Sequence, residues 1–146
     1  MNVRVSTRIA TLLACSALLA APVQAQATKL ILERCVENTR ASGDLYFTIV
    51  NGSETAFMEA TFRVYYLDAD GVPLNRGELG FGQLRPGRLV RGESIFTRTN
   101  CRDIRTAEVE FRFAYDAGGS FVRDVTVFGP IEVISNVEGL SIQFRE

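Results

Sequence analysis

The chain has 146 residues, of which 47% are hydrophobic and 23% are charged, a globular balance that excludes disordered and fibrous classes and fits about one domain. It contains no histidine, which excludes triads with a histidine base, histidine-ligated metal sites and imidazole proton shuttles. Its formal net charge of -1 lacks the basic excess that nucleic-acid binders need, so we expect no nucleic-acid partner.

Residues 1–25 are typical of a secretory signal peptide. Arg4 and Arg8 precede an apolar run from Ile9 to Ala21, and Val23-Gln24-Ala25 supplies the small residues that a signal peptidase requires. The run is shorter than the roughly 18 residues that span a bilayer, so we expect no membrane span after cleavage. The sequence therefore predicts a signal peptide over 1–25, one domain over 26–146, and a secreted or periplasmic protein.

Cys15 leaves one alternative open for this leader. The segment Leu12-Leu13-Ala14-Cys15 resembles the lipobox of bacterial lipoproteins, in which the cysteine is acylated and becomes the new N-terminus. The apolar run continues beyond Cys15, however, as it does in the uncut core of a longer signal. We therefore favour cleavage near residue 25 and leave lipidation of Cys15 as the alternative.

Two cysteines, Cys35 and Cys101, remain in the predicted domain. An even pair in an exported chain predicts a disulfide in preference to a nucleophile or a metal site. Closing a loop of about 67 residues removes about 4 kcal/mol of unfolded-state entropy in the chain-entropy model. The bond is therefore expected to supply a large share of the stability.

The predicted domain is dominated by alternation of apolar and polar residues, which is typical of half-buried strands. Turn signals such as Asn51-Gly52-Ser53 and Asp68-Ala69-Asp70-Gly71 separate the alternating segments. Seven or eight short strands without helical periodicity predict an all-β antiparallel sandwich of the fibronectin-III or immunoglobulin type, with a barrel as the alternative. In chain order the expected strands are 29–36, 45–49 (Leu45, Phe47 and Ile49 inward), 58–66 (Met58, Ala60, Phe62, Val64 and Tyr66 inward), 88–98, 107–115 (Ala107, Val109, Phe111, Phe113 and Tyr115 inward), 121–128, 131–134 and 140–145.

The segment 77–87, GELGFGQLRPG, shows no clear alternation, and we expect a loop or a crossover between sheets. Its glycines do not match the spacing of a nucleotide-binding loop, and no lysine follows them. Glu108 and Glu110 could present two acids to a sugar, but a solvated strand face balanced by Arg112 explains them better. We therefore expect no enzyme, no cofactor and no metal site.

The candidate binding surface consists of exposed aromatics and clustered arginines. Arg forks pair well with carboxylates, and aromatic side chains anchor interfaces. A solvated edge strand and coverage by a neighbouring loop are the alternatives. The candidate residues are Tyr46 and Tyr65 on the polar sides of their strands, Phe81 in the predicted loop, and Arg85, Arg88 and Arg91 after it.

The order of these features resembles a known family. The segments FRVYYLDADG and LRPG resemble fibronectin-III-like sandwiches of bacterial envelope proteins. Cys35 followed by GDLYF and IVNGS, and Cys101 before the strand of Glu108, resemble the small secreted interleukin receptor mimic family. This resemblance implies a cytokine-receptor-like sandwich that binds protein partners and forms a dimer.

The expected function is therefore an exported, non-enzymatic module that binds host or other extracellular proteins. The partner is expected to be a protein, and a homodimer is expected through exposed strand edges. The alternative is a structural or accessory protein of the cell envelope.

Overall fold

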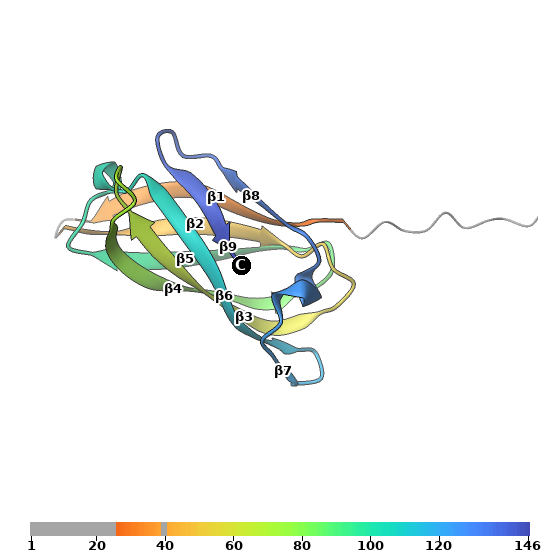
Figure 1. Ribbon diagram of the computed structural model, residues 1–146. Coiled ribbons are helices and arrows are strands. Elements are labelled where there is room, and N and C mark those ends of the chain that lie inside the picture. Colours follow the sequence, from red (N-terminus) through yellow and green to blue (C-terminus); the bar gives the residue numbers. More distant parts are fainter. Residues whose placement is uncertain (1–25, 39–40) are drawn as a thin grey trace, which may run out of the picture.

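The fold was analysed in a computed structural model, which describes residues 26–38 and 41–146. The predicted signal peptide and Cys15 lie outside the described residues. Within these described residues, two short 3-10 turns interrupt a chain that is otherwise made of strands and loops (Figure 1). The elements are β1 (Thr28–Asn38), β2 (Ser42–Val50), β3 (Phe57–Leu67), β4 (Pro73–Leu84), β5 (Leu89–Thr97), η1 (Cys101–Asp103), β6 (Thr106–Asp116), β7 (Phe121–Val122), η2 (Val125–Phe128), β8 (Ile131–Ser135) and β9 (Ser141–Arg145).

The strands form two sheets that pack face to face, which confirms the predicted all-β sandwich. Sheet A has the order β5-β2-β1-β8, and sheet B has the order β4-β3-β6-β7 with β9 also pairing β6. Nine strands are present among the described residues, more than the seven or eight predicted. Most neighbouring strands pair antiparallel, as predicted, but both sheets are mixed, because β8 runs parallel to β1 and β9 runs parallel to β6. Crossover connections rather than hairpins lead to these two strands, and only crossovers permit parallel pairing.

The prediction of a loop or crossover over 77–87 is wrong, because residues 77–84 belong to β4. Glycine is depleted in strands unless another backbone approaches closely. Such an approach occurs at Gly77, where an added Cβ would collide with the Tyr66 hydroxyl, the Ser94 hydroxyl and the carbonyl oxygen of Ile95. The glycine thus allows β4, at the edge of sheet B, to lie against β5, at the edge of sheet A.

The prediction of a strand over 121–128 is correct for its first two residues and wrong for the rest. β7 ends at Val122, and η2 begins after Asp124. The Asp124 carboxylate accepts hydrogen bonds from the Thr126 amide (2.9 Å) and hydroxyl (2.7 Å), and these bonds lower the pKa of Asp124. A capped turn therefore replaces the strand and places Phe128 in the core.

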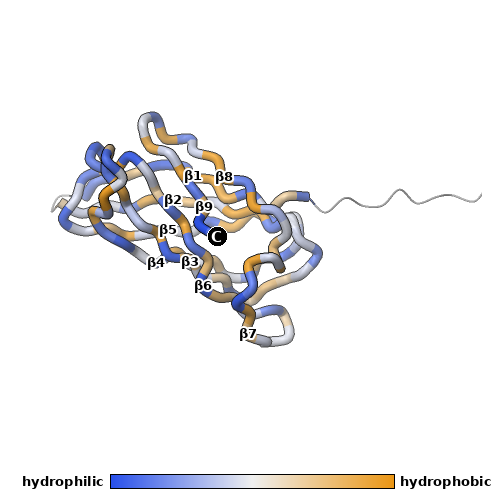
Figure 2. Tube along the Cα trace, in the orientation of Figure 1, coloured by the Kyte–Doolittle hydropathy of each residue, from blue (hydrophilic) through white to orange (hydrophobic). Residues whose placement is uncertain are grey.

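The core lies between the sheets, where apolar residues alternate with outward polar ones along the strands (Figure 2). Leu45, Phe47 and Ile49 are buried in β2 as predicted. Met58 corrects the prediction, because it is 57% exposed while Phe57 is buried. A register irregularity between Phe57 and Glu59 shifts the inward phase by one residue at this point.

A second irregularity corrects the prediction for the end of β6. Phe62 pairs Phe111 and Thr61 pairs Phe113, so Arg112 is an extra residue in β6. The alternation changes phase there: Ala114 becomes buried, and Phe113 and Tyr115 lie on the outer face instead of in the core.

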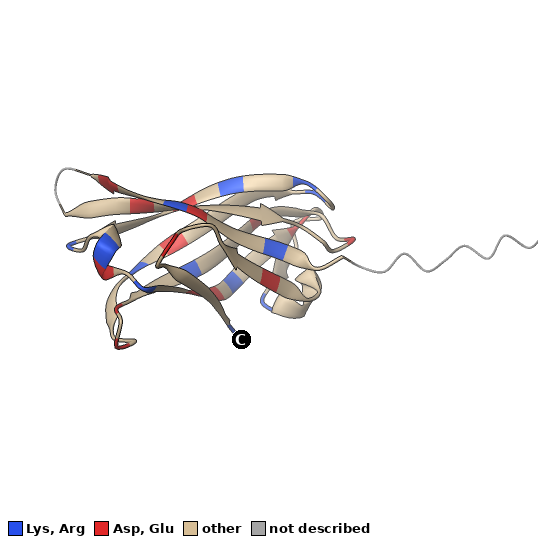
Figure 3. Ribbon diagram, turned by 90° about the horizontal axis from the view of Figure 1, so that it is seen from above, with Lys and Arg blue, Asp and Glu red and all other residues tan. Residues whose placement is uncertain are grey.

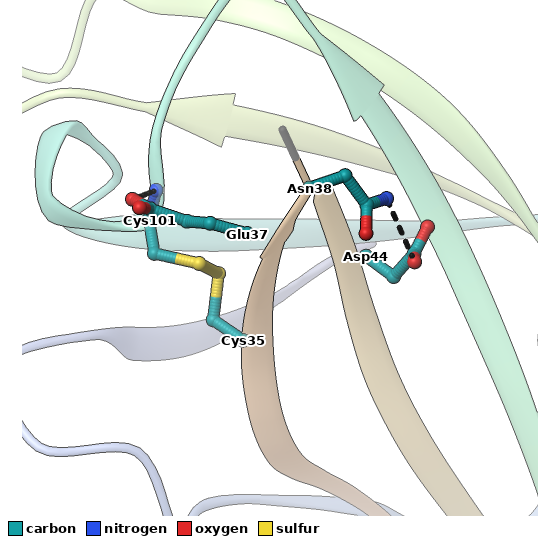
Figure 4. The surroundings of a disulfide bond; sticks show 5 residues. All are labelled: Cys35, Glu37, Asn38, Asp44 and Cys101. Carbon is teal, nitrogen blue, oxygen red and sulfur yellow. Dashed lines mark hydrogen bonds between the residues drawn. A yellow bond between two sulfur atoms is a disulfide. The ribbon is translucent and has the colours of Figure 1, made fainter. Parts of the chain in front are cut away.

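Cys35 and Cys101 form the predicted disulfide, with their Cα atoms 5.9 Å apart (Figure 4). The bond joins β1 to η1, the turn that precedes β6. The Cys101 amide donates a hydrogen bond to Glu37 Oε1 (2.9 Å), which fixes the same turn to β1 a second time. A disulfide is compatible with export to an oxidising compartment. Within residues 26–38 and 41–146, no helix is long and apolar enough to cross a membrane.

Candidate functional site

Tyr46 lies in β2, on the outer face of sheet A, and β2 is flanked by β1 and β5. The register places it beside Arg34 of β1 on one side and beside Glu93 of β5 on the other. The Arg34 guanidinium lies over the ring, with Cζ 4.2 Å from the ring centroid. This cation–π contact holds a half-buried tyrosine in one orientation.

A β-bulge in β1 brings Arg34 to this face. Pairing shifts between Leu32 and Arg34, so Glu33 is an extra residue opposite β2. Strict alternation from Leu30 and Leu32 would have turned position 34 toward the core. The bulge instead exposes Glu33 and Arg34 together, and Glu33 accepts a hydrogen bond from the Asn136 amide group (3.0 Å).

Two depressions flank the tyrosine, and both are lined by Tyr46, Arg34 and Arg91. One, of about 410 Å³, is also lined by Glu33 and Leu89. The other, of about 450 Å³, also reaches Glu93 and two glycines of the β4–β5 contact. We name this region the Tyr46 surface and define it by Glu33, Arg34, Tyr46, Leu89, Arg91 and Glu93.

The Tyr46 surface combines apolar contact area with available charges. Leu89 is 57% exposed, and within the described part of the chain neither Arg34 nor Arg91 has a carboxylate within 4 Å. Both guanidinium groups can therefore donate hydrogen bonds to carboxylates of a partner. Tyrosine and arginine are, with tryptophan, the residue types enriched in the energetic centres of interfaces.

The structure brings together only two of the six candidate binding residues. Tyr46 and Arg91 share the Tyr46 surface, whereas Arg85 and Arg88 are exposed in the β4–β5 turn, which a hydrogen bond from the Arg88 amide to the Arg85 carbonyl oxygen closes (3.0 Å). Phe81 is 1% exposed and belongs to the core, which corrects its placement in an exposed loop. Phe81 lies between two glycines, and these glycines led the sequence analysis to predict a loop where the strand β4 buries Phe81.

Tyr65 lies on the opposite face of the molecule, on sheet B. Its hydroxyl donates a hydrogen bond to Glu110 Oε2 (3.1 Å), and Arg145 lies near its ring, with Cζ 5.6 Å from the centroid. Arg112 pairs Glu110 at 3.7 Å, which places the predicted carboxylates in a charge-balanced strand face. The second carboxylate, Glu108, pairs Arg145 at 3.4 Å.

Sequence reasoning missed Arg34, Glu33, Leu89 and Glu93 as members of this surface. Arg34 and Glu33 depend on a bulge that alternation does not reveal. Leu89 and Glu93 occur within a predicted strand, but only the pairing of β5 with β2 places them beside Tyr46. Acidic and basic residues are interspersed along the ribbon (Figure 3), so charge alone would not have marked the site.

The Tyr46 surface presents two guanidinium groups, two carboxylates, one phenol ring and one aliphatic side chain. Its side chains form no nucleophile–base pair, and no group of three metal-ligating residues occurs in the described ranges. The two depressions are surface hollows, and the side chains around them are suited to contact with another surface.

Comparisons with known proteins give one structural likeness. No family model matches the chain, and no curated protein sequence matches it. The solved structure of IrmA from Escherichia coli is similar, with a TM-score of 0.56 over 73% of this chain and 90% of that chain. The sequences are 13% identical, so the likeness concerns the fold alone.

Proposed function

We propose that this chain is an exported, non-enzymatic β-sandwich that binds an extracellular protein through the Tyr46 surface. The observation that carries the proposal is the ring of Tyr46, held by Arg34 between two depressions and beside Arg91. A tyrosine fixed before binding loses little conformational entropy when a partner covers it. Arg91 then supplies a directional contact to a partner carboxylate.

The arrangement of strand edges supports binding through a face. The two long edge strands, β4 and β5, lie against each other, and the Asn75 side chain donates a hydrogen bond to the Thr97 carbonyl oxygen of β5. The other edge strands, β7, β8 and β9, have only two to five residues. Short edges pair poorly with a foreign strand, which favours the sheet face over edge pairing.

The sequence resemblance to the interleukin receptor mimic family supports a protein partner, and the fold likeness to IrmA agrees with the sandwich that this resemblance implies. By this resemblance, cytokines are the first class of extracellular protein to examine. The signal-like segment 1–25 and the oxidised Cys35–Cys101 pair support export. The homodimer stays a prediction, which light scattering on the oxidised protein tests.

The test is binding of the oxidised, exported protein to an array of purified cytokines and other extracellular proteins. We expect at least one partner, whose affinity falls about tenfold or more in Tyr46→Ala and in Arg91→Ala. Tyr65→Ala is the matched control, because it removes a half-buried tyrosine from the opposite face, and it should leave the affinity unchanged.

Two outcomes would contradict the proposal. Binding that persists in the double variant Tyr46→Ala, Arg91→Ala would place the interface elsewhere. An array without any partner, together with loss of envelope integrity in a deletion strain, would favour the structural or accessory envelope role instead.

A further inference from the structure

The outer face of sheet B carries an aromatic cluster that the core does not use. The bulge at Arg112 turns Phe113 and Tyr115 outward, and pairing with β7 places Phe121 opposite Tyr115. The ring centroids of Phe113 and Phe121 are 5.6 Å apart, and those of Tyr115 and Phe121 are 5.4 Å apart. Phe121 is 49% exposed and Tyr115 is 37% exposed, so the cluster offers apolar area to a ligand.

Three arginines border this cluster. Arg63, Arg112 and Arg123 line a depression of about 360 Å³ together with Glu78 and Phe113. Arg63 pairs Glu78 at 3.4 Å, and Arg112 lies 3.7 Å from Glu110. We name this region the Phe121 surface and define it by Arg63, Arg112, Phe113, Tyr115, Phe121 and Arg123.

Among the described residues, Arg123 differs from the other two arginines of the Phe121 surface in its lack of a nearby carboxylate. In the described ranges no carboxylate lies within 4 Å of it. Its Cζ lies 5.3 Å from the Phe121 ring centroid, which places the guanidinium at the boundary between the depression and the aromatic cluster. A ligand carboxylate bound there would lie directly beside apolar contact area.

The mixture of groups favours an acidic peptide segment over a uniform polyanion. Glu78 and Glu110 lie among the arginines and would repel a densely charged chain such as a sulfated polysaccharide. A peptide can instead space its carboxylates and place an apolar side chain between them, so that it matches both the arginines and the rings.

We propose that the Phe121 surface is a second binding site, which takes an acidic segment of a partner protein by pairing its carboxylates with Arg112 and Arg123 and packing its apolar side chains on Phe121 and Tyr115. It lies on the face opposite the Tyr46 surface and does not depend on it. Two independent faces would let one molecule bridge two proteins.

The probe is a fluorescein-labelled synthetic peptide of alternating glutamate and leucine, titrated with the oxidised protein and followed by fluorescence anisotropy. We expect binding that weakens about tenfold or more in Arg123→Glu, because a charged hydrogen-bonded pair is replaced by repulsion. Phe121→Ala should weaken it several-fold without unfolding the protein. A peptide of alternating glutamine and leucine should not bind.

Arg102→Glu is the matched charge control, since Arg102 lies in η1 with 82% of its side chain exposed. An equal loss of affinity in Arg102→Glu would mean long-range attraction without a site and would overturn the proposal. A loss in Tyr46→Ala would place the peptide on the Tyr46 surface, which also overturns it. Binding of heparin in place of the peptide, abolished by Arg123→Glu, would overturn the peptide class in favour of a polysaccharide.

Discussion

Phe62 lies at the centre of the sandwich, where its ring contacts those of Phe81, Phe111 and Phe128. It is 1% exposed, and deletion of a buried phenylalanine leaves a cavity. We expect Phe62→Ala to lower the free energy of unfolding by about 3 to 5 kcal/mol, measured by urea denaturation. Phe121→Ala is the control, because its half-exposed ring should cost only about 1 kcal/mol. Equal losses would contradict the placement of these rings.

Tyr66 is fully buried, and its hydroxyl forms a hydrogen bond with the Ser94 hydroxyl across the two sheets. Burial raises the pKa of Tyr66 to about 12; the Ser94 hydrogen bond lowers it, and the charge of Asp44 raises it. The folded protein therefore retains this proton at pH values where the unfolded chain, with a pKa near 10, has lost it. Stability from this group is complete below pH 10 and falls as pH rises from 10 toward 12.

The comparison of Tyr66→Phe with the parent protein tests this linkage. At pH 8 the variant should be less stable by about 1 kcal/mol, because it loses one buried hydrogen bond. At pH 11 the deficit should shrink or reverse, since only the parent is penalised by ionisation, by about 1 kcal/mol at that pH. Urea denaturation at both pH values measures the difference, and a constant deficit would show that Tyr66 is not the titrating group.

For individual residues, alternation correctly predicted which side chains point inward in β2 and in the middle of β3, because regular pleating repeats every two residues. It failed at Met58, Phe113 and Tyr115, where an extra residue changes the phase. The same kind of irregularity turns Arg34 outward beside Tyr46 and Arg112 outward beside Phe113. Both proposed surfaces thus depend on bulges, which result from pairing between strands and leave no periodic signal within one strand.

Among the elements, β4 is the one whose prediction failed because of its glycines. Gly77 lies where β4 and β5 approach too closely for a side chain, whereas an added Cβ at Gly80 would contact nothing within 4 Å. A glycine that serves close packing looks the same in the sequence as a glycine in a mobile loop. Only the position of β5 distinguishes the two kinds of glycine. For this reason the sequence analysis predicted a loop or crossover over 77–87 and predicted that Phe81 is exposed.

Gly77→Ala and Gly80→Ala form a matched pair that tests this account. The added methyl group at 77 must displace the Tyr66 and Ser94 side chains or the β5 backbone, and we expect a loss of about 1 to 3 kcal/mol. At 80 the same change meets open space and should be neutral or slightly stabilising, because alanine restricts the unfolded chain more than glycine does. Urea denaturation of both variants measures this, and equal effects would contradict the close β4–β5 contact.

For the whole molecule, the sandwich and its disulfide were predictable, because alternation recurs along most of the described chain and because Cys35 and Cys101 are an even pair behind a segment that is typical of a signal peptide. The strand order was not, since the parallel positions of β8 and β9 depend on crossovers between sheets. The order places the two long edge strands, β4 and β5, against each other. This order is consistent with the proposed binding on the two outer faces in preference to pairing at strand edges.

The disulfide acts on the whole molecule, because it covalently joins β1 to η1, the turn that precedes β6. Its cysteines are separated by 66 positions in the sequence, and release of a loop of that size should lower the free energy of unfolding by about 4 kcal/mol. Cys35→Ser with Cys101→Ser, or reductant on the parent protein, should therefore lower the melting temperature strongly, as followed by circular dichroism. Reductant should not change the melting temperature of the double variant, which separates loss of the bond from other effects of thiols. If reductant left the melting temperature of the parent protein unchanged, packing and the Cys101–Glu37 hydrogen bond alone would hold the loop between β1 and η1.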